Sequence, residues 1–459
     1  MEMDSLRVES SLWIGNKRYR AFLSGWYFSW TEIDKTNRDT SLDNKHVTER
    51  TNQARDYILK KDVTGFDGVI CVGGDGMFSE LLHGVIGRTQ KEAGISEHEP
   101  TVMLQPCDLH IGIIPGGSTD CVCFTTIGIN DPVTSTLHII IGDSQPLDVC
   151  SVHYQSTLVR YSVSMVGYGF YGDVLAESER HRWMGPLRYD YSGCMVYLCN
   201  RSYPGLVQYL PADSHISSPR DNTRCLSGCR VCSESKERLF PHFESSSSLY
   251  STNVSQYSSE LEGEWVTVEG RFKCISLACI SSSCPRSPKG LSPSAHLADG
   301  TADLILVRET NPLGFLTYLH RHTNTQDQFD LPFVEVHRVK AVRFSLPPGG
   351  EEEEEEEEEE GDREIQASAE RVLEDPEKLS SSNAAGHSQQ HLAGRKERGN
   401  VTTSRVKRRG FVCGPCCTKP RSISVWNCDG EILPHTEISC RVHGQLVRLF
   451  ARGIEDSTI

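Results

Sequence analysis

The first apolar positions of the chain follow the two-residue period of β-strands. Between residues 8 and 30 apolar and polar side chains alternate, which predicts two or three short strands. So few strands bury too little surface to fold alone. We therefore expect residues 1–47 to combine strands from a larger N-terminal unit with a linker.

From residue 48 the pattern changes to helices that alternate with buried strands. A helix over 52–60 precedes a strand at 68–72, a second helix over 77–86 and a second strand at 111–114. Strands and helices that alternate at this spacing favour a parallel α/β sheet, whose ligands bind at the carboxyl ends of the strands. We therefore assign residues 48–145 to an α/β domain.

After about residue 146 short alternating runs replace this pattern. They predict an antiparallel β-sandwich domain over residues 146–346, with the polar stretch 211–262 as a long loop. A further strand at 440–450 lies in a C-terminal segment, residues 411–459. The fold class is therefore α/β followed by β. The runs that carry the sandwich prediction are 157–167, 206–210, 264–280, 302–307 and 334–344.

Ten consecutive glutamates, residues 351–360, dominate the charge of the chain. The net charge of the 459 residues is −15 at pH 7, and without this run it is −5. The tract and its polar surroundings predict a disordered insert over 347–410, because they bury too little apolar surface to offset chain entropy. No domain-wide basic surface is left to neutralise phosphates, which counts against a nucleic-acid partner.

The apolar runs of the chain are too short for a membrane-spanning helix, which needs about 18 residues or more. Even the longest, such as 137–141, have the length of a strand. The first residues lack the basic start and apolar core of a signal peptide. Eighteen cysteines without such a signal indicate free thiols in a reducing compartment. These features predict a soluble protein that faces the cytosol.

Each predicted strand of the α/β domain ends in a glycine-rich turn. Gly73-Gly74-Asp75-Gly76 ends the first strand, and residues 115–120, Pro-Gly-Gly-Ser-Thr-Asp, end the second. Glycines let the backbone approach a phosphate, and the helix N-terminus behind each turn adds amide donors. A carboxylate beside a phosphate is repulsive unless it binds a metal or accepts a proton from a nucleophile. The alternative is a tight turn in which Asp75 only caps its helix.

The first turn and the helix after it, Gly73 to Glu80 with His83-Gly84, resemble the signature of the diacylglycerol kinase and sphingosine kinase superfamily. Other segments resemble, within it, the ceramide kinase family. The resemblance covers residues 48–345 and 411–455. The segments are 114–123, 167–173, 217–221, 286–293, 322–329 and 426–431.

The resemblance implies a kinase that transfers the γ-phosphate of Mg-ATP to the primary hydroxyl of ceramide, in a cleft between the α/β domain and the β-sandwich. Asp75 matches the general base, and Gly73, Gly74 and Gly76 lie with it along the substrate. Ca²⁺ is a candidate stimulator. The positions that match the nucleotide pocket are Thr48, Asn52, Glu80, Gly117, Ser118, Thr119, Arg182, Arg188, Asp429, Gly430 and Glu431.

Three of these assignments have alternative interpretations. Arg182 and Arg188 match cations that contact the triphosphate, where they suit the charge that is distributed over the phosphate oxygens during transfer. The alternative is that both are ordinary charged residues on the surface of a helix. The turn at 429–431 is expected to return to the cleft and hold Mg²⁺ through water. Asp429 is also the rival of Asp75 as base, and locally the turn reads as an ordinary β-turn.

Leu175 bears on the choice of lipid. Sphingosine kinases carry an acidic residue near this position, where it suits a free amine. Ceramide has an uncharged amide nitrogen, and an unpaired buried carboxylate beside it is costly. Leu175 therefore favours ceramide over a long-chain base.

Three cysteines, Cys225, Cys229 and Cys232, have metal-ligand spacing, and the ceramide kinase family carries the same triplet. A closed zinc site needs a fourth ligand, for which Cys284, Cys274 or a histidine are candidates. The alternatives are reactive or palmitoylated thiols in a loop, or reduced structural ones.

The family begins with a pleckstrin-homology domain and a glycine-rich nucleotide loop, whereas here residues 8–30 resemble only the opening strands of such a domain. We therefore expect a truncated chain, and the sequence does not decide whether this chain is active. The alternatives are an inactive lipid-binding isoform or a related diacylglycerol or long-chain-base kinase. The resemblance also implies peripheral binding to Golgi and plasma membranes, through exposed apolar residues or the basic run 405–409.

Overall fold

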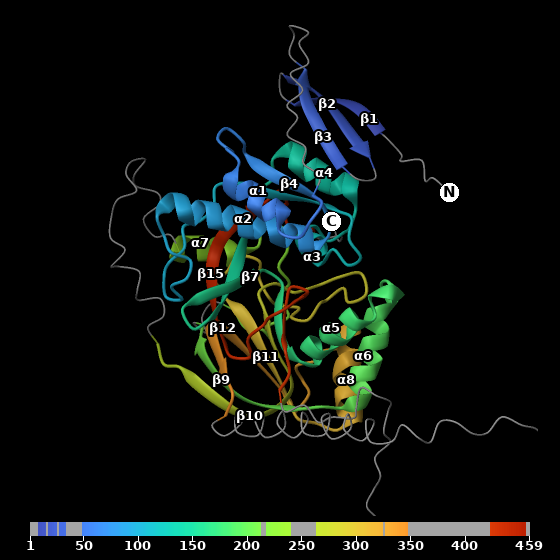
Figure 1. Cartoon of the computed structure of the whole chain (residues 1–459), viewed down its shortest axis with the longest axis vertical. Helices are drawn as coiled ribbons and strands as arrows, with labels where there is room; N and C mark the ends of the chain where they lie inside the picture. The colour runs from blue at the N-terminus through green and yellow to red at the C-terminus, as the bar shows by residue number, and fades with distance from the viewer. Residues whose placement is uncertain are drawn as a thin grey trace, which may run out of the picture. The chain divides into compact units, whose positions relative to one another are not determined.

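The computed structural model describes the chain in several stretches (Figure 1). The predicted acidic insert lies outside these residues except for its first one, as do the beginning of the C-terminal segment and residues 34–47. The described ranges are 8–14, 17–24, 27–33, 48–212, 217–239, 263–324, 326–347 and 423–455.

The N-terminal alternation forms a small antiparallel sheet. Its strands are β1 (Val8–Ile14), β2 (Lys17–Ser24) and β3 (Tyr27–Ile33), in the order β1-β2-β3. Residue Val8 pairs with Leu23, and Arg18 pairs with Ile33. The prediction of two or three short strands is confirmed.

The helix-strand alternation that follows is also confirmed. Helix α1 (Gln53–Lys60) precedes strand β4 (Gly68–Gly73), helix α2 (Asp75–Ala93) and strand β5 (His110–Pro115). β4 and β5 run parallel, so both strands end at the same edge of the sheet.

Helix α2 is longer than predicted, because it ends at Gly94 rather than near residue 86. Gly94 has a φ of 70°, a left-handed conformation that closes the helix. Gly84 inside the helix is needed for packing, since a Cβ there would lie 3.0 Å from the Cβ of Ile58 in α1. Gly84 therefore allows α1 and α2 to pack closely and does not end α2.

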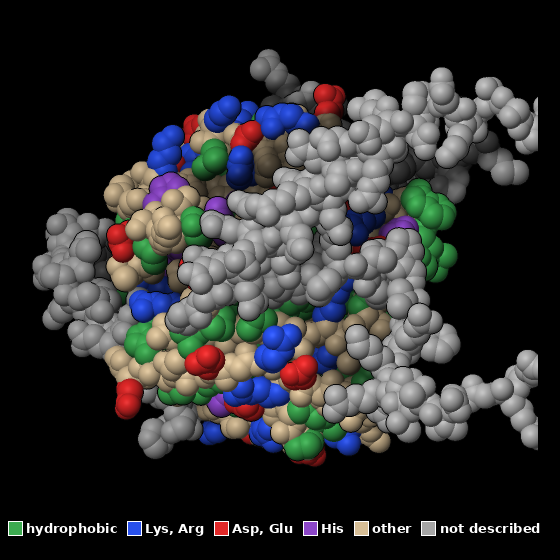
Figure 2. Space-filling view, turned by 60° about the horizontal axis from the view of Figure 1, so that its bottom comes forward, with side chains coloured by type: hydrophobic (Ala, Val, Ile, Leu, Met, Phe, Trp, Pro, Cys, Tyr) green, Lys and Arg blue, Asp and Glu red, His purple; other side chains and the backbone are tan. Residues whose placement is uncertain are grey.

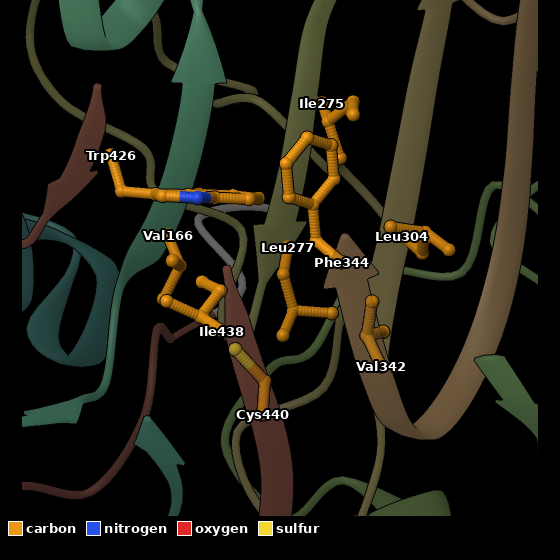
Figure 3. A pocket seen from close by; sticks show the side chains of 9 residues that line it. All are labelled: Val166, Ile275, Leu277, Leu304, Val342, Phe344, Trp426, Ile438 and Cys440. Atoms are coloured by element: carbon orange, nitrogen blue, oxygen red, sulfur yellow. The ribbon is translucent and has the colours of Figure 1, made fainter. Parts of the chain in front are cut away.

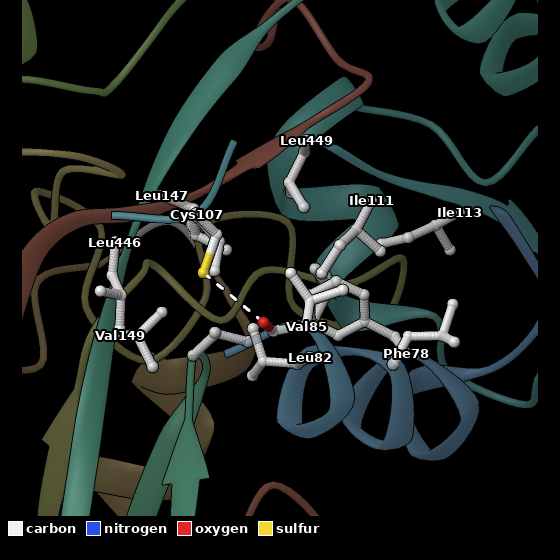
Figure 4. Packing of buried hydrophobic residues seen from close by; sticks show 14 of the residues in the cluster. Phe78, Leu82, Val85, Cys107, Ile111, Ile113, Leu147, Val149, Leu446 and Leu449 are labelled. Carbon is white, nitrogen blue, oxygen red and sulfur yellow. Dashed lines mark hydrogen bonds between the residues drawn. The ribbon is translucent and has the colours of Figure 1, made fainter. Parts of the chain in front are cut away.

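The two faces of β5 are covered by different helices. Ile111 and Ile113 join Phe78 and Leu82 of α2 in one apolar cluster, which Figure 4 shows together with the weak contact from the Cys107 thiol to the Val85 carbonyl. Successive strand residues point to opposite faces. Helix α3 (Cys121–Ile127) follows β5, and helix α4 (Pro132–Ile141) covers the face on which Gly112 lies.

Residues 137–141, whose length suggested a strand, belong to helix α4. Asp131 starts this helix by accepting the N–H of Thr134 at 2.8 Å, and Pro132 occupies its first turn. A short apolar run cannot by itself distinguish a strand from a helix. The cap residues before the run decide the conformation here.

The antiparallel strands are continuous with the parallel pair. Strand β15 (Ile438–Leu449) pairs antiparallel with β12 and β6, and its last residue pairs parallel with Ile111 of β5. In the part of the chain that is described, a single 12-stranded sheet results. The mixed class of helices and strands is thus confirmed. The further strands are β6 (Gln145–Tyr154), β7 (Thr157–Ser162), β8 (Met165–Gly169), β9 (Tyr203–Pro211), β10 (Val266–Ala278), β11 (Ala302–Arg308), β12 (Val334–Ser345), β13 (Trp426–Cys428) and β14 (Glu431–Ile432).

The core between the antiparallel strands is densely packed. A cavity of about 10 Å³ lies between apolar side chains of β8, β10, β11, β12, β13 and β15, including Trp426 and Phe344 (Figure 3). This volume holds about one water molecule. No lipid chain fits there.

Helices flank these strands. The 3₁₀ turn η1 (Arg182–Met184) connects α5 (Phe170–Arg180) to α6 (Leu187–Cys199), and α8 (Pro312–Thr323) lies next to α6 (Figure 1). The stretch predicted as a long loop contains helix α7 (Arg230–Leu239), which corrects that prediction in part. Leu239 packs against Gly300 and Gly444, so tertiary contacts stabilise α7.

Candidate active site

The two glycine turns are in contact at the carboxyl ends of β4 and β5. The N–H of Gly116 donates to the carbonyl of Gly73 at 3.2 Å. A Cβ on Gly117 would lie 2.6 Å from the Cα of Gly74, so only glycine allows this approach. Gly76, Ser118 and Thr119 are exposed around the contact.

Asp75 joins the two turns. It is the first residue of α2, and its carboxylate accepts the N–H groups of Cys121 and Val122, each at 3.0 Å. These donors belong to the first turn of α3, where amide groups lack partners within their own helix. Asp75 therefore caps α3, and not its own helix as the alternative interpretation supposed.

A second carboxylate closes the turn after β5. Asp120 accepts the N–H of Gly117 at 2.9 Å. Burial raises the pKa of Asp120, and the negative charge of Asp75 adds to the rise against the effect of the hydrogen bond. This contact holds the Gly117–Thr119 segment in one conformation.

The C-terminal turn is a two-residue hairpin between β13 and β14. Cys428 pairs with Glu431, and Asp429 and Gly430 between them have φ angles of 48° and 88°. This backbone requires residues that tolerate a left-handed conformation, for which Asp-Gly is a preferred pair. The sequence Asp-Gly-Glu therefore forms the predicted turn.

Asp429 points into the protein, where its carboxylate has four hydrogen-bond donors. They belong to the connection between β7 and β8. Burial raises the pKa of Asp429, against the effect of these donors. The carboxylate thus orders this connection. The donors are the Ser162 hydroxyl at 2.8 Å and the N–H groups of Val163 at 2.8 Å, Ser164 at 3.2 Å and Met165 at 2.8 Å.

The glycine turns and the C-terminal turn meet through two side chains. The Cys121 thiol lies 3.5 Å from the Ser164 hydroxyl. The backbone of Cys121 binds Asp75, and the backbone of Ser164 binds Asp429. Both predicted rivals for the role of base therefore belong to one site.

Arg160 of β7 is a site residue that the sequence did not reveal. Its guanidinium donates to the hydroxyl of Ser79 in α2 at 3.1 Å and lies 4.0 Å from the carboxylate of Glu431. It thus connects α2 to the C-terminal turn. A single arginine in an alternating strand gives no local signal of such a role.

Arg182 and Arg188 are brought together by Glu179. Arg182 donates to its carboxylate at 2.6 Å, and Arg188 approaches the other oxygen to 3.5 Å. The hydrogen bond that Arg182 donates to Glu179 raises the pKa of Arg182, to which the charge of Glu431 also contributes. The two arginines are therefore grouped on the side of α5 that faces β14. Glu179 was not predicted as a site residue.

Glu80 and Asn52 are in direct contact. The Glu80 carboxylate accepts the N–H groups of Asn52 at 2.7 Å and Ala54 at 3.0 Å, at the start of α1. Thr48 lies half-buried shortly before this helix. Two predicted nucleotide positions are thus adjacent, and Glu80 also caps α1.

Leu175 is buried in α5, with 5% of its surface exposed. Two residues earlier, Asp173 accepts hydrogen bonds from the hydroxyls of Tyr203 and Ser424. The buried carboxylate of Asp173 in α5 thus has hydroxyl groups as its hydrogen-bond donors.

The cysteine triplet gathers around a histidine. The side chains of Cys225, Cys229, Cys232 and His296 place their ligand atoms within 4.8 Å of one another. The fourth member is thus a histidine, one of the predicted options, rather than Cys284 or Cys274. His296 lies far away in the sequence and has no motif of its own.

None of the helices in the described stretches is both long enough and apolar enough to cross a bilayer. On the face drawn in Figure 2, basic and acidic side chains are interspersed over the coloured surface. This mixture agrees with the near-neutral balance of the chain outside its glutamate run.

Two family models match the chain. The diacylglycerol kinase catalytic domain matches residues 33–152, and the ceramide kinase C-terminal domain matches residues 227–374. Among solved structures, a putative diacylglycerol kinase from Bacillus anthracis aligns with a TM-score of 0.45 at 13% identity, over 88% of this chain and 84% of its own.

Curated relatives extend the match over most of the chain. Mouse ceramide kinase is 46% identical over 415 residues, which cover 90% of this chain and 68% of the relative. Human ceramide kinase is 46% identical over 413 residues, or 90% of this chain and 67% of the relative. Two thirds of each relative are therefore represented here at high identity. The chain belongs to the ceramide kinase family.

Proposed function

We propose that the chain transfers the γ-phosphate of ATP to the primary hydroxyl of ceramide and forms ceramide 1-phosphate. Family membership supports this reaction. The observation that carries it is the contact between the two glycine turns, with the Asp75 carboxylate at their junction. The exposed backbone of the glycine turns, beside the N-terminus of α2, suits phosphate groups, and a carboxylate there suits a hydroxyl nucleophile.

Asp75 accepts the proton of the ceramide hydroxyl while the hydroxyl oxygen attacks the γ-phosphate. Its two amide contacts fix the orientation of the carboxylate, and it lies half-buried at the glycine turns. Asp429 is less suited to this role, because its oxygens already accept four hydrogen bonds, whereas those of Asp75 accept two. We therefore prefer Asp75 as the base and assign Asp429 to the positioning of the turn.

The remaining groups bind the nucleotide. Ser118 and Thr119 contact the phosphates, while Arg182 and Arg188 balance their negative charge. Glu431 offers an exposed carboxylate oxygen of the kind that Mg²⁺ prefers. Bound Mg²⁺ would neutralise charge on the β- and γ-phosphates. Stimulation by Ca²⁺ stays a prediction.

Within this scheme, residues 48–145 supply the glycine turns of the nucleotide site. Residues 146–346 bind the lipid and contribute Arg182 and Arg188 to the phosphates, and 347–410 is an acidic insert in neither domain. The lipid approaches from the side of α5. Leu175 near the bound lipid favours a neutral amide over the cationic amine of a long-chain base.

The same side of the protein offers apolar residues to a membrane. Trp183 is 81% exposed, Leu187 64% and Leu313 76%. They lie on η1, α6 and α8, and the last two helices touch where the Tyr197 hydroxyl donates to the carbonyl of Pro312 at 3.1 Å. Exposed aromatic and aliphatic side chains of this kind mark a contact surface. We assign it to peripheral binding of the cytosolic face of Golgi and plasma membranes.

Transfer from labelled Mg-ATP tests the reaction. We expect short-chain ceramide to be phosphorylated at least tenfold more efficiently than sphingosine or diacylglycerol in matched micelles. Equal use of diacylglycerol or sphingosine would instead identify a related lipid kinase. Binding of ceramide without binding of ATP would identify an inactive lipid-binding isoform.

A further inference from the structure

Three cysteines and a histidine converge on one point, and none of them belongs to the residues that we assign to the reaction. Cys225 and Cys229 precede α7, and Cys232 lies in its first turn. His296 lies in the connection between β10 and β11. Their ligand atoms all lie within 4.8 Å of one another. Two segments that are distant in sequence thus present four metal-binding side chains to the same space.

The spacing of the ligand atoms fits a tetrahedral ion. The sulfur atoms of Cys225 and Cys232 are 3.7 Å apart, and the Cys229 sulfur lies 3.3 Å from Nδ1 of His296. In a tetrahedral zinc site with Zn–S bonds of about 2.3 Å, two sulfur ligands are about 3.8 Å apart. A disulfide would need about 2.05 Å. The observed distances therefore match ligands around an ion and not a covalent pair.

The surroundings hold these ligands in place. Cys225, Cys232 and His296 are buried. The N–H of Leu297 donates to the Cys225 sulfur at 3.5 Å, and the Gln445 amide donates to the carbonyls of Cys232 and Ala298. Outer contacts of this kind orient the ligands of a metal. Gln445 belongs to β15, so the cluster is tied to the strand that joins the antiparallel and parallel parts of the sheet.

The imidazole of His296 supplies an independent sign of a ligand. Its Nε2 atom is buried and has no hydrogen-bond partner among the residues described, while its Nδ1 atom is directed at Cys229. Asp299, whose Oδ2 atom is also buried and without a hydrogen-bond partner, is close enough for its charge to interact with the ring. The Asp299 carboxylate makes its ion pair with Arg338, at 3.7 Å, so the unpartnered Nε2 atom leaves the imidazole free to turn either nitrogen toward a metal.

We propose that Cys225, Cys229, Cys232 and His296 bind one structural Zn²⁺ ion. Thiolates with one imidazole suit zinc, whereas Mg²⁺ and Ca²⁺ prefer oxygen ligands. Four protein ligands leave no open position, so the ion joins α7 to the β10–β11 connection and takes no part in phosphoryl transfer. Binding displaces the protons of the three thiols, so zinc is held more weakly at low pH.

Metal analysis of protein purified without chelator tests this site. We expect about one zinc per chain, and less than a tenth of that in Cys232→Ser and in His296→Asn. Cys194→Ser, at an exposed cysteine of α6, is the matched control and should keep its zinc. Cobalt exchanged into the wild-type protein should show the visible absorption of a tetrahedral thiolate site.

A second measurement needs no variant and so remains decisive if the substituted proteins do not fold. A strong chelator should lower the melting temperature of the wild-type protein, and Zn²⁺ but not Mg²⁺ should restore it. A folded wild-type protein with less than a tenth of an equivalent of zinc, whose melting is unchanged by chelator and by added zinc, would show that the cluster is a set of packed thiols and would overturn the proposal.

Discussion

The carboxylate of Asp75, at the start of α2, accepts the backbone N–H of Val122 in α3 at 3.0 Å. Two helices that follow different strands are thereby linked at the point where their strands end. The same carboxylate is the group that we propose as the general base. Its position is therefore defined by the backbone of a second turn, and the turn depends on it in return.

Asp75→Asn should lower the turnover of ceramide by about 10²- to 10⁴-fold, the usual contribution of a general base. Asparagine keeps one oxygen for the amide groups of α3, so we expect the fold to survive. Steady-state phosphate transfer and circular dichroism measure both effects. Asp67→Asn, at an exposed position before β4, is the control and should be fully active. Undiminished turnover in Asp75→Asn would exclude Asp75 as the general base.

Gly117→Ala should weaken ATP binding and destabilise the protein by about 1–3 kcal/mol, the usual cost of overpacking. The new Cβ would lie 2.6 Å from the Cα of Gly74 and from the carboxylate of Asp120, so the two turns must separate. Denaturant unfolding and nucleotide titration measure the two effects. Gly76→Ala meets no atom within 4 Å and is the matched control for stability. If both variants have the same free energy of unfolding, the contact between the two turns does not contribute to stability.

The half-buried imidazole of His83 should make the protein sensitive to acid. Burial lowers the pKa of His83 from 6.5 to about 4, and the charge of Arg160 adds to this. The unfolded chain therefore binds the proton more readily. Stability from this group is full above pH 6.5 and is lost as the pH falls towards 4, by about 3 kcal/mol.

His83→Gln removes this titration, so its unfolding free energy should fall less between those pH values than that of the wild type. Urea unfolding across the pH range measures the difference. His320→Gln, at an exposed position of α8, should keep the wild-type slope. An unchanged slope in His83→Gln would assign the acid sensitivity to other groups.

Arg160→Ala should loosen the C-terminal turn, because the side chain connects Ser79 of α2 to Glu431. We expect a loss of stability of about 1.5–3 kcal/mol, typical of a hydrogen bond to a charged group, together with a higher KM for ATP. Arg452→Ala removes an exposed ion pair to Asp143 and should cost less than about 1 kcal/mol. Equal losses in the two variants would mean that Arg160 does not support the site.

Much of the local structure could be predicted from the sequence. The alternation of residues 8–30, the helix before β4, both parallel strands and the two glycine turns follow from short-range patterns, because strand and helix periods are properties of neighbouring residues. Where such patterns were short or polar, they did not indicate the correct secondary structure. Residues 137–141 are helical because of the cap at Asp131, and α7 forms because Leu239 finds apolar partners far away in the sequence.

The sequence by itself determined the family, the glycine turns and the position of their candidate carboxylates, since these are carried by residue types at fixed spacing. Only the tertiary structure decided which groups meet. Val122 as the partner of Asp75, Arg160 beside Glu431 and His296 beside the cysteine triplet all come from segments that no local pattern connects. Such pairs arise from the pairing of strands and the packing of helices, which depend on long-range burial that a window of sequence does not contain.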